Sequence, residues 1–220
     1  MDHASEQITA LRLSGRSGDR LRVFVDGVEL CKIDALRAHE LDLRVGRDLT
    51  PEQRQDLLIA GEQTRASDLA LRWIAAHSRT RVEIERRLGA RGIAGDIAQQ
   101  TSERLVAAGL IDDRRHARAM IDTLRRRGAG KRLLEHKLRS AGIDNAIARA
   151  EIERALEGVD LADEALECAR SRVRALRGRG GARTIARRTS AHLARRGYDP
   201  HTCHDAVRRA LGEADLEPDV

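Results

Sequence analysis

Aromatic side chains are nearly absent from this chain of 220 residues, which holds one Phe, one Trp and one Tyr. Hydrophobic residues make up 41% of the sequence and are mostly Ala, Leu, Ile and Val, a composition that suits closely packed helices. Many proteins hold single-stranded nucleic acid on a continuous track of stacked aromatic rings. Three aromatic residues cannot form such a track, so this class of binding surface is excluded.

Cysteines are few, and long apolar runs are missing. Cys31, Cys168 and Cys203 are odd in number and far apart, which argues against a disulfide framework and fits a reducing compartment. No apolar run approaches the ~20 residues of a membrane-spanning helix. The N-terminal MDHASEQ lacks the apolar segment of a secretory signal. We therefore expect a cytoplasmic protein with no membrane association.

Acidic residues are unevenly distributed along the chain. Residues 1–62 hold nine Lys and Arg against twelve Asp and Glu, a net charge of −3, so the rest of the chain carries +9. Ten arginines and no acid lie between Arg170 and Arg196. Such a surface points to a polyanion or an acidic protein partner. The plainer alternative is a solvated helical surface with no partner.

Recognisable catalytic and cofactor motifs are also missing. The glycine-rich run at 177–183, RGRGGAR, lacks the GxxxxGK[ST] pattern and follows no predicted strand. His201, Cys203 and His204 could bind zinc, but no second pair stands at finger spacing. Cys203 shares an apolar stripe with Val207, so we expect a core cysteine. The sequence predicts no catalytic residue, no metal site and no cofactor.

The stretch GLIDDRRHARAM has two interpretations. Asp112, Asp113 and His116 could bind a metal or carry out acid–base chemistry. Alternatively, Asp112 caps a helix and Asp113 stabilises the positive end of its dipole. A metal would need further ligands, and the neighbouring segments offer no matching Asp or His. The sequence favours the helix start.

The first 62 residues differ from the rest and predict a small β-rich module with two short helices. Hydrophobic residues alternate on both sides of Asp26-Gly27, the strongest short-range signal for a β-hairpin. Asp34 is placed to cap the first helix, and Thr50 to open the second with a capping box.

The remaining sequence predicts helix after helix and repeats itself. LGARGI (88–93), LRSAGI (138–143) and LARRGY (193–198) each contain Leu, three residues, Gly and a hydrophobic residue. This pattern is typical of a helix that ends in a left-handed glycine turn. It predicts a mainly α fold, in which three three-helix repeats form an elongated, curved array behind the β module. The predicted segments are the module 1–62, the repeats 63–111, 112–158 and 159–212, and the acidic tail 213–220.

Basic residues in the second and third repeats are the candidate contact residues for a protein or DNA partner. Between Arg114 and Arg139, ten basic residues stand against two acids, more than helix ends require. The candidates are Arg118, Arg125, Arg126, Lys131, Arg132, Lys137, Arg172, Arg183, Arg187 and Arg188.

Three segments resemble the bacterial regulatory protein RecX family. HSRTRVEIERRL (77–88) is similar to the family's segment Ser/Thr-x-x-Glu-Leu-x-x-x-Leu, with Ile84 at the Leu position. The stretch from Gly109 to Ile143 resembles its hydrophobic-Asp-Asp segment, basic helix, Gly-x-Gly and Leu-x-x-x-Gly-Ile. LARRGYDPHTCHDAV (193–207) is similar to its C-terminal segment.

Other positions extend or depart from the resemblance. VFVDGVEL (23–30) resembles a β-hairpin extension found in some members. His116 and Ala129 stand where the family usually, or often, carries an aromatic residue.

The resemblance implies a function that composition alone does not supply. Members of the family are three-helix repeat proteins without catalytic residues that bind the RecA recombinase in the groove of its filament on single-stranded DNA. They limit filament extension, ATP hydrolysis, strand exchange and co-protease activity, and thereby affect DNA repair, recombination and the SOS response. For this chain we expect a monomer that binds the filament, and bare DNA more weakly. The rival hypotheses are a sequence-nonspecific DNA-binding protein independent of RecA, and a metalloenzyme built on Asp112, Asp113 and His116.

Overall fold

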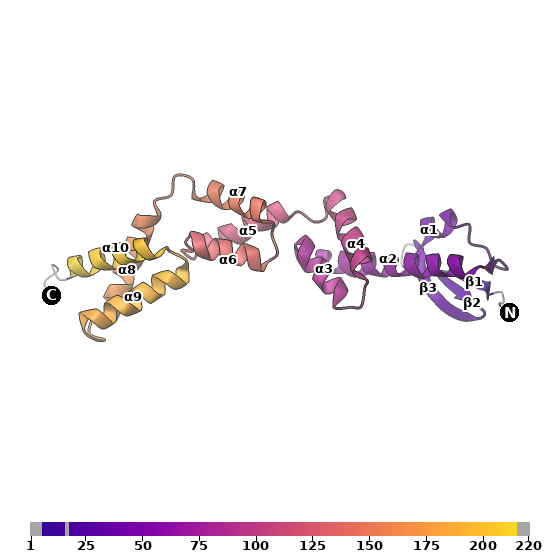
Figure 1. Cartoon of the computed structure of the whole chain (residues 1–220), viewed down its shortest axis with the longest axis horizontal. Coiled ribbons are helices and arrows are strands. Elements are labelled where there is room, and N and C mark those ends of the chain that lie inside the picture. The colour runs from indigo at the N-terminus through magenta and orange to yellow at the C-terminus, as the bar shows by residue number, and fades with distance from the viewer. Residues whose placement is uncertain (1–5, 16–17, 215–220) are drawn as a thin grey trace. The chain divides into compact units, whose positions relative to one another are not determined.

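We describe residues 6–15 and 18–214 from a computed structural model (Figure 1). The chain divides into two compact units, Met1–Ile111 and Asp112–Val220. Ten helices and four strands lie within the described ranges. The fold is therefore mainly α with a small strand module at its N-terminal end, as the sequence predicts. The predicted acidic tail from residue 215 onward lies outside the described residues.

The N-terminal strands form one antiparallel sheet in the order β3-β2-β1-β4. Asp26 and Gly27 join β2 to β3 with φ angles of 46° and 81°, the left-handed values that a two-residue hairpin turn requires. The hairpin predicted from Asp-Gly is confirmed. The strands are β1 (Glu6–Ser14), β2 (Arg20–Val25), β3 (Val28–Asp34) and β4 (Asp48–Leu49).

Two helices pack on one face of this sheet. Asp34 accepts a hydrogen bond from the amide of Leu36 and caps α1 (Ala35–Glu40). Thr50 opens α2 (Pro51–Ala76) with a reciprocal capping box, as predicted. Buried residues of the sheet and both helices form one core: Ile8, Val23, Val25, Ile33, Ala38, Leu49, Leu57 and Ala60.

The helix α2 differs from the sequence-based expectation, because it runs through the predicted segment boundary at residue 62. One helix of 26 residues takes the place of a second short helix and the first helix of repeat one. Gly61 does not interrupt it. A Cβ at Gly61 would lie 2.7 Å from the Cβ of Cys31, so glycine lets α2 approach β3 closely. The change of amino-acid composition near residue 62 therefore falls inside α2, where the helix stops packing on the sheet and begins to pack on the following helices.

The C-terminal half of α2 packs with α3 (Arg81–Gly89) and α4 (Gly95–Ala107). Thr80 caps α3 by accepting a hydrogen bond from the amide of Glu83. The core of this triplet lies apart from that of the sheet and consists of Ala66, Leu69, Ala70, Ile84, Leu88, Ile93, Ile97, Ala98, Leu105 and Ile111.

Two further triplets form the second unit. In one, α5 (Asp113–Arg125), α6 (Lys131–Ser140) and α7 (Asn145–Leu156) enclose a core around Ile121, Leu134 and Ile152. In the other, α8 (Leu161–Leu176), α9 (Ala182–Arg196) and α10 (Pro200–Ala214) enclose Leu166, Leu193 and Val207. No helix in the described part of the chain is both long and apolar enough to cross a bilayer.

The three sequence repeats form the same helix-ending turn. In each, the amide of the hydrophobic residue donates to the carbonyl of the Leu five positions earlier: Ile93 to Leu88 at 3.1 Å, Ile143 to Leu138 at 3.1 Å, and Tyr198 to Leu193 at 3.3 Å. All six of these side chains are buried. The turn therefore closes each helix and also returns a hydrophobic residue to its own core.

Main-chain contacts join the two triplets of the second unit at one point. The amide of Gly130 donates to the carbonyl of Arg196 at 2.7 Å, and the amide of Arg132 donates to that of Gly197 at 3.0 Å. A Cβ at Gly130 would lie 2.7 Å from the carbonyl oxygen of Gly197, and a Cβ at Gly197 would lie 2.2 Å from the amide nitrogen of Leu133. We call this contact between the start of α6 and the end of α9 the glycine joint. It needs glycine on both sides.

Candidate functional site

The ten predicted contact residues fall into two groups, because some of their charges are used inside the protein. Arg118 on α5 binds the carboxylate of Glu151 on α7 through two hydrogen bonds of 2.8 and 3.1 Å. Arg114 and Arg154 also approach this carboxylate, at 3.6 and 3.0 Å. The Glu151 side chain is only 3% exposed. Arg118 therefore has a structural task, the neutralisation of a buried charge.

The pKa of Glu151 lies below its ordinary value because Arg118 hydrogen-bonds the carboxylate; burial acts against this effect, and Arg154 adds to it. A lowered folded-state pKa stabilises the protein above the unfolded pKa of about 4.3, and this stabilisation is lost as pH falls through the folded value. The ion cluster around Glu151 is expected to hold α5 and α7 together at neutral pH.

Replacing Glu151 with Gln is expected to lower the free energy of unfolding by about 2 kcal/mol at pH 7, because the arginines lose a charged acceptor. The deficit should shrink as the pH falls below the unfolded-state pKa of about 4.3 and on through the lowered pKa of folded Glu151. Urea unfolding across this pH range measures both effects. Glu153→Gln, on the exposed side of the same helix, is the matched control. Equal stability of both variants at pH 7 would contradict the assignment.

Arg125 also acts inside the protein. Its guanidinium donates to the carbonyl of Ala129 at 2.7 Å and to the carboxylate of Glu164 on α8 at 2.6 Å. The side chain is 16% exposed. Arg125 thereby fixes the Gly128–Gly130 turn and connects the second triplet to the third. Arg172 is half-buried, with its Nε shielded from solvent.

The exposed side of α6 is strongly basic. Leu134 and Leu138 turn inward, whereas Lys131, Arg132 and Lys137 are exposed and form no ion pair with any residue in the described ranges. Arg139 shares this exposure, although the sequence prediction omitted it. The helix has no acid in its first turn, so the four cations are opposed locally by Glu135 alone.

The exposed side of α9 is similar. Ile185, Thr189 and Leu193 are buried, and the helix contains no acidic residue. Arg183, Arg187 and Arg188 are exposed and have no carboxylate partner in the part of the chain that the structure describes. Arg195, which the prediction missed, belongs with them. Helical spacing from the buried positions would have identified both Arg139 and Arg195.

The glycine joint brings these two helices together. Its hydrogen bonds place Lys131 and Arg132, at the start of α6, next to Arg195 and Arg196, at the end of α9. We call the exposed cations of the two helices the basic surface: Lys131, Arg132, Lys137, Arg139, Arg183, Arg187, Arg188 and Arg195. Arg126, at the end of α5, is also exposed.

An open groove of about 560 Å³ runs along one edge of α6. It lies between α6 and α7, so part of the basic surface borders a hollow rather than a flat helix face. Its mixed charge suits a polar, extended partner surface better than a small apolar ligand. The lining residues are Lys131, Glu135, Arg139, Asn145, Ala148, Arg149, Ile152 and Glu153.

The aspartates at the start of the second unit serve as a helix start. The carboxylate of Asp112 accepts a hydrogen bond from the amide of Arg115 at 2.8 Å and caps α5, as predicted. His201 pairs with Asp205, and Cys203 is buried in the core. Residues 6–15 and 18–214 contain no group of three or more His, Cys, Asp or Glu side chains arranged to hold a metal ion.

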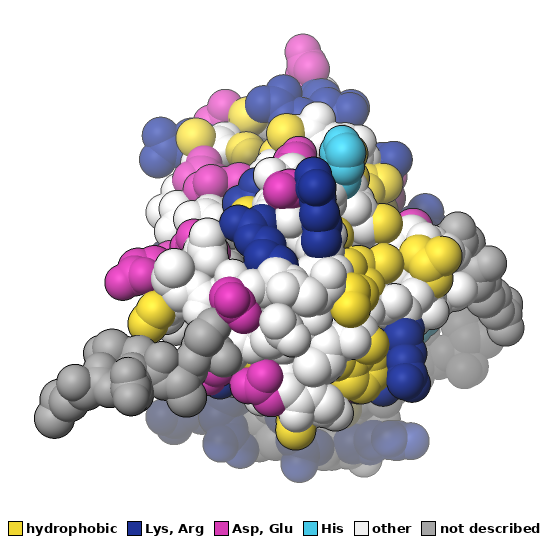
Figure 2. Space-filling model, turned by 90° about the vertical axis from the view of Figure 1, so that its right-hand side faces the viewer, with side chains coloured by type: hydrophobic (Ala, Val, Ile, Leu, Met, Phe, Trp, Pro, Cys, Tyr) yellow, Lys and Arg dark blue, Asp and Glu magenta, His cyan; other side chains and the backbone are white. Residues whose placement is uncertain are grey.

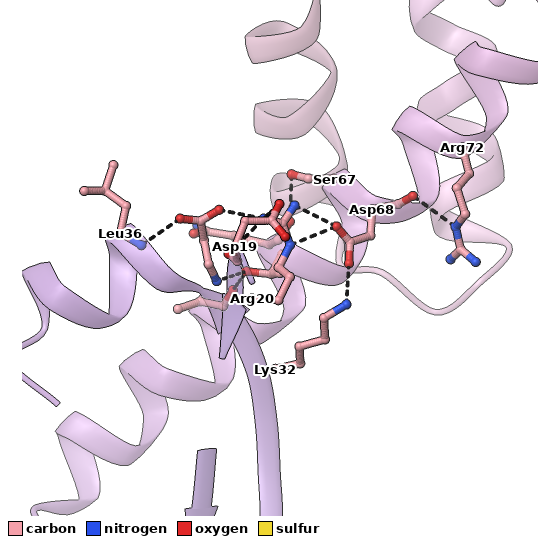
Figure 3. Close-up of polar contacts among 11 residues, drawn as sticks. Asp19, Arg20, Lys32, Leu36, Ser67, Asp68 and Arg72 are labelled. Atoms are coloured by element: carbon pink, nitrogen blue, oxygen red, sulfur yellow. Dashed lines mark hydrogen bonds and ion pairs between the residues drawn. The ribbon is translucent and has the colours of Figure 1, made fainter. Parts of the chain in front are cut away.

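A separate polar cluster anchors the sheet to α2 (Figure 3). Arg20 is 15% exposed and binds Asp68 at 2.9 Å and Asp34 at 2.8 Å, while Lys32 reaches Asp68 at 2.9 Å. Burial alone would raise the pKa of Asp68, but hydrogen bonds from Lys32 and Arg20 outweigh it and lower the pKa. These side chains satisfy one another, which indicates a structural role for the cluster.

Burial also governs the thiol of Cys31, raising its pKa to about 11. The neutral thiol is a poor nucleophile at physiological pH. All three cysteines are free within the described residues. Cys31 therefore serves to pack β3 against Gly61 of α2.

Comparison with known proteins gives a consistent set of relatives. No protein-family model matches the chain. A protein named regulatory protein RecX from Mycolicibacterium vanbaalenii is 36% identical over 170 residues, which cover 73% of this chain and 89% of that protein. A protein of the same name from Mycobacterium avium is 35% identical over 154 residues, covering 68% and 86%.

Solved structures show the same fold. A crystal structure of regulatory protein RecX aligns with a TM-score of 0.70 and 19% sequence identity over 93% of this chain and 99% of that one. RecX from Lactobacillus salivarius aligns with a TM-score of 0.56 and 20% identity over 71% and 98%. At these identities the structural likeness concerns the fold alone.

Proposed function

The chain belongs to the RecX family of regulatory proteins, and from this premise we propose that it binds the filament that the RecA recombinase forms on single-stranded DNA. In this proposal the bound protein limits filament extension, and with it ATP hydrolysis, strand exchange and co-protease activity. The protein acts in the cytoplasm as a monomer, without a catalytic step of its own.

The observation that carries this proposal is the basic surface of α6 and α9. Its eight cations are exposed, and none forms an ion pair within the described ranges, so their charge is available to a partner. In this proposal the cations face acidic side chains of the filament together with the phosphates of its DNA. Charges exert their effect over about 8 Å at physiological salt, so several adjacent cations can act on one such surface.

The family resemblance and the basic surface together favour one refinement of the predicted contact residues. Arg118 and Arg125 are occupied by Glu151 and Glu164, so they support the contact surface rather than form it. Arg139 and Arg195 join the predicted cations of α6 and α9 as direct contacts. Binding is expected to weaken with increasing salt, because it depends on exposed charges.

The same cations also favour a second candidate function, sequence-nonspecific binding to DNA without RecA. The two candidates differ in what raises the affinity. A filament regulator binds single strands covered by RecA more tightly than bare single strands. A DNA-binding protein that acts without RecA has no higher affinity for the covered strands.

The first test is ATP hydrolysis by the cognate RecA on single-stranded DNA, titrated with this protein. We expect inhibition at well below one copy per RecA subunit, because a protein that blocks filament growth acts on many subunits. Binding to bare DNA is measured in parallel. Unchanged hydrolysis together with tight binding to bare DNA would reject the filament proposal in favour of the second candidate.

A further inference from the structure

The sheet of the N-terminal module has a second face, opposite to the one that α1 and α2 cover. Val23, Val25 and Ile33 point toward the helices and lie in the core. Residues between them on the strands point the other way, since side chains alternate along a strand. This outer face carries Arg12, Arg22, Phe24 and Lys32.

Three cations form a row across the outer face. Arg12 on β1 stands directly opposite Arg22 on β2, and Arg22 stands directly opposite Lys32 on β3. All three are exposed. Like charges at directly opposed positions destabilise a sheet. Such a row calls for anionic partners, which the protein itself supplies only in part.

Acidic residues compensate this row only in part. Glu29 forms an ion pair with Arg22, and Asp68 binds Lys32. Arg12 has no carboxylate partner within residues 6–15 and 18–214. The positive charge is thus left uncompensated on the β1 side of the outer face.

The same face holds the aromatic residue that lies outside the described hydrophobic cores. Tyr198 is buried in the core of α8–α10, and Trp73 packs against the core of α2–α4. Phe24 belongs to neither, nor to the core of the sheet. It is half-exposed, and the guanidinium groups of Arg12 and Arg22 lie over its ring, 4.9 and 5.4 Å from the ring centre.

We propose that the outer face of the N-terminal sheet binds single-stranded DNA, with Phe24 stacking on a base and Arg12 and Arg22 contacting the flanking phosphates. A half-exposed ring beside two cations offers a stacking contact for a base and charges for the phosphates next to it. A duplex offers phosphates but no unstacked base, so it would lose the contact with Phe24. This inference goes beyond both candidate functions, because it assigns a contact with single-stranded DNA to the N-terminal module and not to the basic surface of α6 and α9.

Figure 2 shows apolar side chains exposed among charged ones on the face turned to the viewer. One exposed apolar residue of the N-terminal module supplies a matched control. Leu13 lies next to Arg12 on β1, is 70% exposed, and points to the other side of the strand. Leu13→Ala removes a similar exposed apolar side chain without touching the proposed site. Phe24→Trp keeps the ring and should retain binding.

The test is fluorescence anisotropy of a labelled 20-nucleotide oligo-dT, titrated with the full-length chain at low salt. Phe24→Ala is expected to weaken the affinity about tenfold, a typical loss for one stacked base. Arg12→Gln should weaken it about threefold and flatten its salt dependence. Leu13→Ala and Phe24→Trp should bind like the wild type. Melting curves of all four variants establish that each is folded.

Two results would overturn the proposal. One is unchanged affinity of folded Phe24→Ala for the oligonucleotide. The other is an equal loss for a duplex of the same length, since a stacking site distinguishes the two. If Phe24→Ala impairs filament binding but not oligonucleotide binding, the outer face contacts protein, and the DNA assignment is wrong. Inhibition of ATP hydrolysis by RecA is measured separately. The filament proposal is therefore tested independently of the DNA site proposed here.

Discussion

Reversal of four charges on the basic surface to glutamate, at Lys131, Lys137, Arg183 and Arg187, is expected to weaken binding to the RecA filament by about a hundredfold. Each replacement removes an attraction and introduces a repulsion at an exposed position. The slope of log affinity against log salt should also flatten, because fewer counterions are exchanged. Anisotropy of a labelled protein titrated with preformed filament measures both quantities.

The fold should tolerate these changes. None of the four side chains forms an ion pair within the described residues, and all four are exposed. Surface substitutions of this kind usually change the free energy of unfolding by less than about 0.5 kcal/mol each. Loss of binding can therefore be read as loss of contact, provided that the melting temperature is preserved.

The control is an equal change of net charge elsewhere on the protein. Arg65, Arg72, Arg86 and Arg104 are exposed arginines on helices of the first unit, and none forms an ion pair within the described ranges. Their reversal should reduce filament binding only a few-fold, through long-range attraction. If both fourfold variants lose affinity equally, net charge alone matters, and α6 and α9 are not the contact surface.

Gly197→Ala is expected to destabilise the second unit by about 2 to 4 kcal/mol. Gly197 has φ of 86°, and a methyl group in the left-handed region costs about 1 kcal/mol. In addition, the new Cβ would lie 2.2 Å from the amide nitrogen of Leu133, so main chain must move. Overpacking of this kind typically costs a further 1 to 3 kcal/mol. Chemical denaturation followed by circular dichroism measures the change.

Two glycines separate the conformational cost from the steric one. Gly92 occupies the same position in the first repeat turn, and Gly158 follows α7 within the second unit. Both have positive φ, but an added Cβ would meet nothing within 4 Å. Gly92→Ala and Gly158→Ala should therefore each cost only about 1 kcal/mol. A loss of similar size at Gly197 would show that the glycine joint tolerates a side chain.

The elements predicted from local patterns agree with the structure because local contacts determine them. The Asp-Gly hairpin needs only two residues with positive φ, and the caps at Asp34 and Asp112 bind amides two or three positions away. The repeated turns likewise depend on residues within one hexapeptide. Such features can be predicted from a single sequence, since all the interacting groups lie in one short window.

The features that the sequence did not reveal depend on contacts between distant residues. Arg118 and Glu151 are 33 positions apart, and Arg125 and Glu164 are 39 apart. Their pairing follows from helix packing, so charge counting could not separate these arginines from the exposed ones. The continuity of α2 past Gly61 has the same origin, because only the approach of β3 explains a glycine there.

The glycine joint has an evolutionary consequence. At the glycine joint, two adjacent triplets meet through main-chain hydrogen bonds without intervening side chains, so this contact does not depend on the identity of the exposed cations on α6 and α9. Cations on α6 and α9 can therefore be gained, lost or reversed over generations without repacking the junction. Selection can therefore change the affinity of α6 and α9 for a partner while the contact between the two triplets is conserved.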